Sequence, residues 1–380
     1  MRVEVDVNML TWAIERAGYD PSEFAQKMPQ ITAWLNDERK PTVKQLEEFS
    51  RKVHLPYGYL FLPEPPKESL PIPFFRTKDR KGEKVSLNVY DTILTLQRRQ
   101  GWLKEYLQDN DFEPLKYVGQ FKNSQELMIR SSNVDAIVNS IRSTLGLAAD
   151  WTRHRRNRQD ALDYLVENIE DKGIITVFNG VVENNTYRKI EVEECRGFVL
   201  VDDFAPFMFI NNADSKAAQL FTIVHELAHI WTGHSAGFDF RTLQPADDPI
   251  EILCDKVAAE FLVPDNTFND QCHENPDIQG CARFFKVSEL VIARRSLDTG
   301  KIPKEQFFEF YEEYKNQEIV KKQNHGSGGD FYATVRRRLS PTFASHIHNA
   351  VKTGKLLYRD AYKLTGMKGD TFDKFFDKTM

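Results

Sequence analysis

The residues best suited to chemistry in this sequence are His225, Glu226 and His229, which are spaced as H-E-x-x-H. Histidines four positions apart lie one turn apart on a helix, so both imidazoles can reach a single metal ion. Glu226 is rotated by about 100° from His225 on such a helix, close enough to contact water at the metal without being a ligand. The pattern is typical of zinc-dependent peptidases and predicts a zinc site with Glu226 as general base.

A catalytic zinc site requires a third protein ligand and leaves a fourth position for water. One class of peptidase supplies it as a Gly and a His placed three and six residues after the second histidine. Thr232 and Ser235 stand at those positions, which excludes that class. The third ligand is therefore expected from a following helix.

Helical periodicity predicts that helix over 249–263. Glu251 and Asp255 share one of its faces with alanines that permit close approach to the H-E-x-x-H helix. We expect Glu251 to ligate the metal and Asp255 to accept the second ring N–H of a ligand histidine. Glu260 is the competing carboxylate, but it lies about 180° from Glu251 and is expected to face solvent. Two histidines and a glutamate would also accept Mn²⁺, and abundance and geometry favour Zn²⁺.

Two blocks of the sequence resemble the ImmA/IrrE family of bacterial and phage metallopeptidases. They run from Gly197 to Ser235, including Ile210-Asn211 and Phe221-Thr222, and from Glu251 to Pro264. The resemblance implies that His225, His229 and Glu251 hold zinc and that Glu226 is the base. It also implies a protein substrate, either a transcriptional repressor or an antitoxin-like partner. At Asp255 the family more often has Asn, and Asp keeps the hydrogen-bond acceptor.

The substrate contacts are less sharply indicated. We expect the strand that ends in Phe209, Ile210 and Asn211 to edge the cleft, where an extended peptide could pair with it. Tyr187, His234 and His273 are candidate donors to the oxyanion, and each also has a purely structural interpretation.

The elements that position these residues suggest an α+β protein with a zincin-like peptidase domain. Short β-branched and aromatic runs after Gly173 predict strands, which we expect in one short antiparallel sheet. The expected organisation is a helical module at 1–62, a Pro-rich linker at 63–85, and a helical lead-in with the peptidase domain at 86–320 (core about 160–300). A flexible joint at 321–330 and a basic helical region at 331–380 follow.

The N-terminal helices resemble an Xre-type helix-turn-helix module. Only Pro29-Gln30 separates the second predicted helix from the next, and residues 1–66 carry 8 Lys/Arg against 10 Asp/Glu. We therefore expect a docking module, with DNA binding as the alternative. Residues 321–380 carry 12 Lys/Arg against 5 Asp/Glu, and Arg336-Arg337-Arg338 offers a phosphate contact. Such fusions also resemble antitoxins, so a binding protein that neutralises a toxin, with a structural or latent zinc site, is a second hypothesis.

The composition of the chain excludes several classes of protein. The chain has 380 residues, 41% hydrophobic and 28% charged, with a net charge of −5, as in an ordinary globular protein. No apolar run is long enough to cross a membrane, and the start of the chain shows no secretion signal. The four cysteines form no disulfide framework by spacing, and Cys272 and Cys281 match no standard zinc pattern, so they are expected to be buried or free. These features predict a cytoplasmic protein.

Overall fold

The structure, a computed structural model, describes residues 1–68, 74–75, 85–122, 131–238, 248–272, 276–322 and 331–379. The chain divides into two compact units. The first comprises Met1–Pro71 and Gly82–Asp91, and the second comprises Ile72–Lys81 and Thr92–Met380. His273 and most of the predicted linker and joint lie outside the described residues.

The first unit is a bundle of short helices, as the sequence predicts. Its elements are α1 (Val7–Arg16), α2 (Pro21–Lys27), α3 (Ile31–Leu35), α4 (Val43–Lys52) and a 3₁₀ turn η1 (Tyr57–Phe61). Asp20 caps α2 with Pro21 in its first turn, and Thr42 and Gln45 form a capping box on α4. Phe24, Trp34 and Phe49 fill the core. Helix α3 has five residues.

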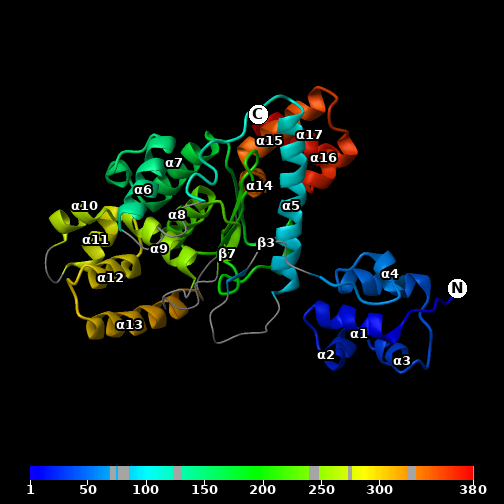
Figure 1. The fold of residues 1–380 in the computed structure, drawn as a ribbon. Coiled ribbons are helices and arrows are strands. Elements are labelled where there is room, and N and C mark those ends of the chain that lie inside the picture. The colour runs from blue at the N-terminus through cyan, green and yellow to red at the C-terminus, as the bar shows by residue number, and fades with distance from the viewer. Residues whose placement is uncertain are drawn as a thin grey trace. The chain divides into compact units, whose positions relative to one another are not determined.

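The second unit contains the sheet and the remaining helices (Figure 1). The helices before the sheet are α5 (Leu87–Gln108), which belongs to this unit from Thr92 onward, α6 (Ser131–Leu145) and α7 (Arg158–Glu170), with the 3₁₀ turn η4 (Trp151–His154). The strands are β1 (Phe74–Phe75), β2 (Ile175–Asn179), β3 (Val181–Val182), β4 (Asn185–Lys189), β5 (Gly197–Leu200), β6 (Phe207–Asn211) and β7 (Ala236–Phe238). Helices α8 (Lys216–Thr232), α9 (Pro249–Leu262), α10 (Asp265–Gln271), α11 (Ile278–Phe285), α12 (Glu289–Asp298) and α13 (Lys304–Lys322) follow β6, with β7 between α8 and α9.

The main sheet has the strand order β1-β7-β5-β6-β2, and β3 and β4 form a separate hairpin. It is mixed, and the expectation of one antiparallel sheet was wrong. Strand β2 runs parallel to β6 and β1 parallel to β7, whereas β5 is antiparallel to both β6 and β7. Local patterns give no strand direction. Every residue of β2 and β6 is buried, as is usual for parallel strands covered on both faces.

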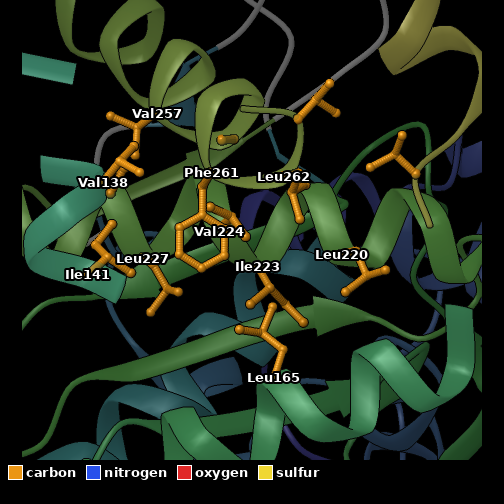
Figure 2. Packing of buried hydrophobic residues seen from close by; sticks show 14 of the residues in the cluster. Val138, Ile141, Leu165, Leu220, Ile223, Val224, Leu227, Val257, Phe261 and Leu262 are labelled. Carbon is orange, nitrogen blue, oxygen red and sulfur yellow. The ribbon is translucent and has the colours of Figure 1, made fainter. Parts of the chain in front are cut away.

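Side chains alternate between the two faces of this sheet. Val199 and Met208 are register partners on one face and pack with α8 in the main hydrophobic core. This core joins α6, α7, α8 and α9, and its members include Ile141, Leu165 and Phe261 (Figure 2). Helix α8 is therefore buried on nearly all sides.

The opposite face is covered by α5 and the C-terminal helices α14 (Phe331–Leu339), α15 (Pro341–Lys352), α16 (Tyr358–Thr365) and α17 (Asp370–Thr379). Phe343 of α15 packs edge-on against both Phe207 of β6 and Trp102 of α5. Arg99 of α5 is buried and donates to the main-chain oxygens of Leu364 and Arg338. The C-terminal region is thus part of the second unit.

Two of the three consecutive arginines on α14 have protein partners. Arg337 pairs with Asp163, and Arg338 donates to the side chain of Asn184 at 3.2 Å. Their predicted role in contacting phosphates stays a prediction, and the structure assigns both side chains a packing role.

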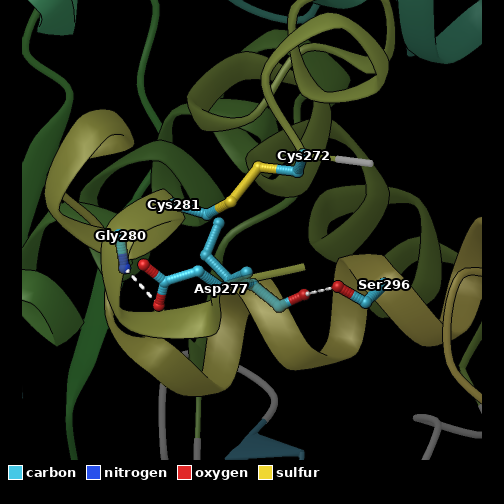
Figure 3. Close-up of a disulfide and its surroundings, with 6 residues drawn as sticks. Cys272, Asp277, Gly280, Cys281 and Ser296 are labelled. Carbon is cyan, nitrogen blue, oxygen red and sulfur yellow. Dashed lines mark hydrogen bonds between the residues drawn. A yellow bond between two sulfur atoms is a disulfide. The ribbon is translucent and has the colours of Figure 1, made fainter. Parts of the chain in front are cut away.

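Cys272 and Cys281 are buried, as one of the two expectations had it, but they form a disulfide, so the expectation of no disulfide among the cysteines was wrong (Figure 3). Cys272 ends α10 and Cys281 lies in α11, with 6.5 Å between their Cα atoms. Tertiary packing brings the two helices together, which the nine-residue spacing does not reveal. Cys195 and Cys254 are buried and lie outside this disulfide. Across the described segments, no helix combines the length and apolarity needed to cross a bilayer.

Candidate metal centre

Helix α8 carries the H-E-x-x-H residues, and its ends are well defined. Ser215 caps the N-terminus, and Gly233 ends the helix in the left-handed region with φ of 74°. The side chains of His225, Glu226 and His229 are all 0% exposed. The predicted helix is therefore present, and the three residues lie in the interior of the second unit.

Helix α9 brings Glu251 to the two histidines. Asp248 caps this helix, Pro249 opens it, and Glu251 lies in its first turn. The Oε2 atom of Glu251 is 3.2 Å from Nε2 of His225, and its Oε1 atom is 3.1 Å from Nε2 of His229. The two Nε2 atoms are 3.1 Å apart. Three ligand-type groups thus converge on one point.

These distances fit a tetrahedral ion. With zinc–ligand bonds of about 2.0–2.1 Å, neighbouring ligands of a tetrahedron lie about 3.3–3.4 Å apart. Both oxygens of Glu251 are buried and make no hydrogen bond of good geometry to the described residues, although each lies close to an imidazole nitrogen. A buried carboxylate needs a positive partner, and a metal ion held by the same two imidazoles would supply it. The residues therefore fit a bound metal.

Asp255 lies one turn after Glu251 and orients the first histidine. Its Oδ1 atom is 3.0 Å from Nδ1 of His225, the contact expected for a carboxylate that holds a ligand imidazole. Its side chain is 37% exposed, unlike those of the ligands. Glu260 was expected to face solvent. Instead, it forms an ion pair with Arg295 of α12.

Glu226 is unlike the other carboxylates of the site. Neither of its oxygens has a hydrogen-bond partner within the described ranges. Burial raises the pKa of Glu226 to about 8, which outweighs the attraction of His225 that lowers it. A cation at the histidines would favour the ionised form. Glu226 is thus free to accept a proton rather than committed to a structural hydrogen bond.

Gly197 of β5, which was not predicted as a site residue, makes room for Glu226. A Cβ atom at Gly197 would lie 2.5 Å from Cγ2 of Thr222 and 3.3 Å from Oε1 of Glu226. Only glycine fits this approach of strand to helix. A single glycine in a predicted strand often marks a place where another segment approaches closely. Gly197 in the run RGFVLVD is such a glycine, so the sequence contained this signal.

Cys254 was also missed as a neighbour of the metal ligands. The possible ligand atoms of His225, His229 and Cys254 lie within 4.8 Å of one another in a buried cluster. A zinc–sulfur bond of about 2.3 Å would place sulfur roughly 3.6 Å from the other ligands, so the carboxylate of Glu251 is the better placed. Burial raises the pKa of the Cys254 thiol well above its usual value.

The structure contradicts the predicted role of strand β6 at the edge of the substrate cleft. Strand β6 lies inside the sheet, because β5 and β2 pair on its two sides, so Phe209, Ile210 and Asn211 do not edge a cleft. The amide of Asn211 is buried and donates to the carbonyl oxygens of Ile190 and Cys195.

The two described oxyanion candidates also differ in position. The side chain of Tyr187, on the β3–β4 hairpin, is 96% exposed, which sets it apart from the buried ligands. His234 follows the C-cap of α8, and its main-chain N–H donates to the carbonyl oxygen of His229 at 3.1 Å, so it lies near the site. The structure thus favours His234 over Tyr187.

The fold and the site together define a metallopeptidase-type domain, with an H-E-x-x-H helix on a mixed sheet and a carboxylate from the next helix. The comparisons with known families agree. Residues 169–297, about a third of the chain, match the family model of the IrrE N-terminal-like domain, Peptidase_M78. All the candidate ligands and Glu226 fall inside the matched range.

A second family model matches the C-terminal region. Residues 339–378, which include α15, α16 and nearly all of α17, match a domain of unknown function, DUF8813. No curated protein matches the chain.

Proposed function

We propose that the protein is a zinc-dependent endopeptidase that cleaves a regulatory protein partner. The observation that carries the proposal is the convergence of His225, His229 and Glu251 at 3.1–3.2 Å beside a buried, unpartnered Glu226. A purely structural zinc site closes with four protein ligands and needs no base. Here the described ligands number three, and a carboxylate without a partner stands next to them.

Each residue of the site has a separate role in peptide hydrolysis. Zinc held by His225, His229 and Glu251 would supply Lewis acidity toward a water molecule and a carbonyl oxygen. Glu226 accepts a proton from that water and returns it to the amine that leaves when the C–N bond breaks. Asp255 keeps the His225 imidazole oriented with Nε2 toward the metal. The matched family supports a protein substrate, with a transcriptional repressor or an antitoxin-like protein as the proposed class.

A substrate trap tests the proposal. Glu226→Gln removes the base while it preserves the shape of the site. Wild type and variant are expressed in the source cells, captured, and their bound proteins and new peptide termini are identified by mass spectrometry. We expect the variant to retain an intact partner and wild type to yield its fragments. An intact partner held equally by both proteins would instead identify a binding protein, such as an antitoxin, with a latent zinc site.

Regulation through DNA is a separate proposal for the first unit and the basic C-terminal helices. It requires binding to duplex DNA that weakens steeply with salt, because phosphate contacts release counterions. Binding that does not change with salt concentration would refute it.

A further inference from the structure

The C-terminal helices carry exposed apolar side chains set among positive charges. They lie where α15 ends and α16 begins, and we call this the basic surface; its residues are Lys355, Leu357, Tyr358, Arg359 and Lys363. Leu357 is 65% and Tyr358 54% exposed, and the side chains of Arg359 and Lys363 are 76% and 63% exposed. Large apolar side chains that are exposed next to one another, with a charged border, mark a surface that another molecule covers.

The basic surface fits a protein partner better than a nucleic acid. Phosphate groups would use its cations alone and would leave the exposed Leu357 in water. Asp360 also lies among these cations, 3.2 Å from Nζ of Lys363 and 3.5 Å from Nε of Arg359, and its charge would repel a phosphate. The partner that this surface fits therefore presents an apolar side chain bordered by carboxylates.

Helix α13 of the same chain has a surface of that description. We call it the acidic surface; its residues are Glu305, Phe308, Glu309 and Glu312, and all of them are exposed. Their spacing of three and four residues places them on one face of the helix. Phe308 is 49% exposed, whereas its neighbour Phe307 is buried and packs against α12. An exposed phenylalanine with a border of carboxylates complements the basic surface in both charge and apolar content.

One molecule cannot bring these two surfaces together. Helix α13 packs against α12, which joins the core on the side of the sheet that carries α8. Helix α16 packs against α15, and α15 covers the opposite face of the sheet through the contact of Phe343 with Phe207. Figure 1 accordingly shows α13 and α16 far apart. A contact between the two surfaces therefore requires a second copy of the chain.

We propose that the basic surface of one copy docks on the acidic surface of another, so that the protein associates head to tail. Leu357 and Tyr358 cover Phe308, and Arg359 and Lys363 face the glutamates of α13. Because two different surfaces take part, each copy keeps one surface free, and the association continues into longer oligomers unless it closes into a ring. The inference does not depend on the proposed peptidase function, since no residue of the metal centre takes part.

Sedimentation velocity of the full chain tests the proposal, at concentrations from about 1 µM to about 200 µM, where contacts of modest area dissociate. Phe308→Gln and Leu357→Ser each remove the apolar centre of one surface. Both suit their positions, because glutamine is a good helix former and Leu357 is the N-cap of α16, where serine is favoured. Tyr187→Ser is the matched control, because it removes an exposed aromatic side chain on the β3–β4 hairpin, outside both surfaces.

We expect the mean sedimentation coefficient of wild type and of Tyr187→Ser to rise with concentration, and to rise less at high salt because exposed charges are screened. Phe308→Gln and Leu357→Ser should each raise the apparent Kd of association at least about tenfold. An equimolar mixture of these two variants should form a dimer that does not grow, because each pair retains one intact contact. A wild type that stays monomeric at the highest concentration, or variants that associate as wild type does, would overturn the proposal.

Charge reversal guards against a variant that loses association because it fails to fold. Glu309→Arg and Arg359→Glu should each weaken association, and the chain that carries both should recover it, because opposite charges again face each other across the contact. Loss in both single variants without recovery in the double variant would contradict the proposal. Titration of a fluorescent DNA duplex tests the other occupant of the basic surface. DNA binding that Arg359→Glu abolishes, with sedimentation unchanged, would assign this surface to nucleic acid and refute the association.

Discussion

Replacement of Gly197 by alanine tests the contact between strand β5 and the metal-bearing helix. The added Cβ atom would lie 2.5 Å from Cγ2 of Thr222 and 3.0 Å from the carbonyl oxygen of Phe209. Ordinary contacts begin at 3.4 Å, so helix and strand must separate by about 0.9 Å, the difference between 3.4 and 2.5 Å. Overpacking of this kind in a buried site costs about 1–3 kcal/mol. We expect Gly197→Ala to lower the free energy of unfolding by about 2 kcal/mol.

Catalysis should suffer as well, because the same Cβ atom would lie 3.3 Å from Oε1 of Glu226. A displacement near 1 Å of a catalytic group costs about 100-fold in rate. Urea unfolding measures the stability of the variant, and cleavage of the substrate found by the trap measures its kcat/KM.

Thr222→Ser provides the matched control, because it removes only Cγ2 and keeps the hydroxyl. The double variant Gly197→Ala with Thr222→Ser should recover at least 1 kcal/mol relative to additive losses, since the closest contact is gone. Recovery should be partial, because the contact with the carbonyl oxygen of Phe209 remains. Strict additivity in the double-mutant cycle, or a Gly197→Ala protein as stable as wild type, would refute the close approach on which the reasoning depends.

The remaining predictions concern the metal and the disulfide. Glu226→Gln should bind zinc as wild type does, measured by metal analysis, and lose at least about 100-fold in kcat; equal turnover would exclude it as the base. Asp255→Ala should weaken zinc affinity by about 10- to 100-fold in a competition titration with a chelator, and unchanged affinity would contradict its role toward His225. Cys272→Ser with Cys281→Ser should lower the free energy of unfolding by about 2–3 kcal/mol, because the bond closes a short loop; a midpoint in urea equal to that of the oxidised wild type would show that the bond adds no stability.

Local sequence patterns predict the helices of the site well. The positions of His225 and His229, and of Glu251 and Asp255, follow from the 3.6-residue period of two helices that tertiary structure preserves. Their convergence also follows, because a helix with small side chains on one face can approach its neighbour closely. Capping residues such as Asp20 and Thr42 mark helix starts for the same local reason.

Strand order and direction are not local properties, and here the sequence misleads. The run ending at Asn211 has the composition of a strand, but nothing in it indicates that β5 and β2 enclose it. The pairing of Cys272 with Cys281 and the contact of Glu260 with Arg295 likewise depend on how separate helices pack. The role of Gly197 could be predicted in part. A glycine in a strand indicates that another segment approaches closely, but it does not indicate which segment.

The buried Arg99 has a consequence for how the chain matures during synthesis. Its guanidinium is desolvated, and burial lowers its pKa to about 10, so its stability depends on the carbonyl oxygens of Arg338 and Leu364. Those acceptors are synthesised long after the sheet that α5 covers. Until they leave the ribosome, Arg99 stays hydrated and Phe207 stays uncovered, so this face of the sheet does not reach its final packing. The helices α14 to α17 therefore complete this face of the sheet late in synthesis, after every strand and α8 have been made.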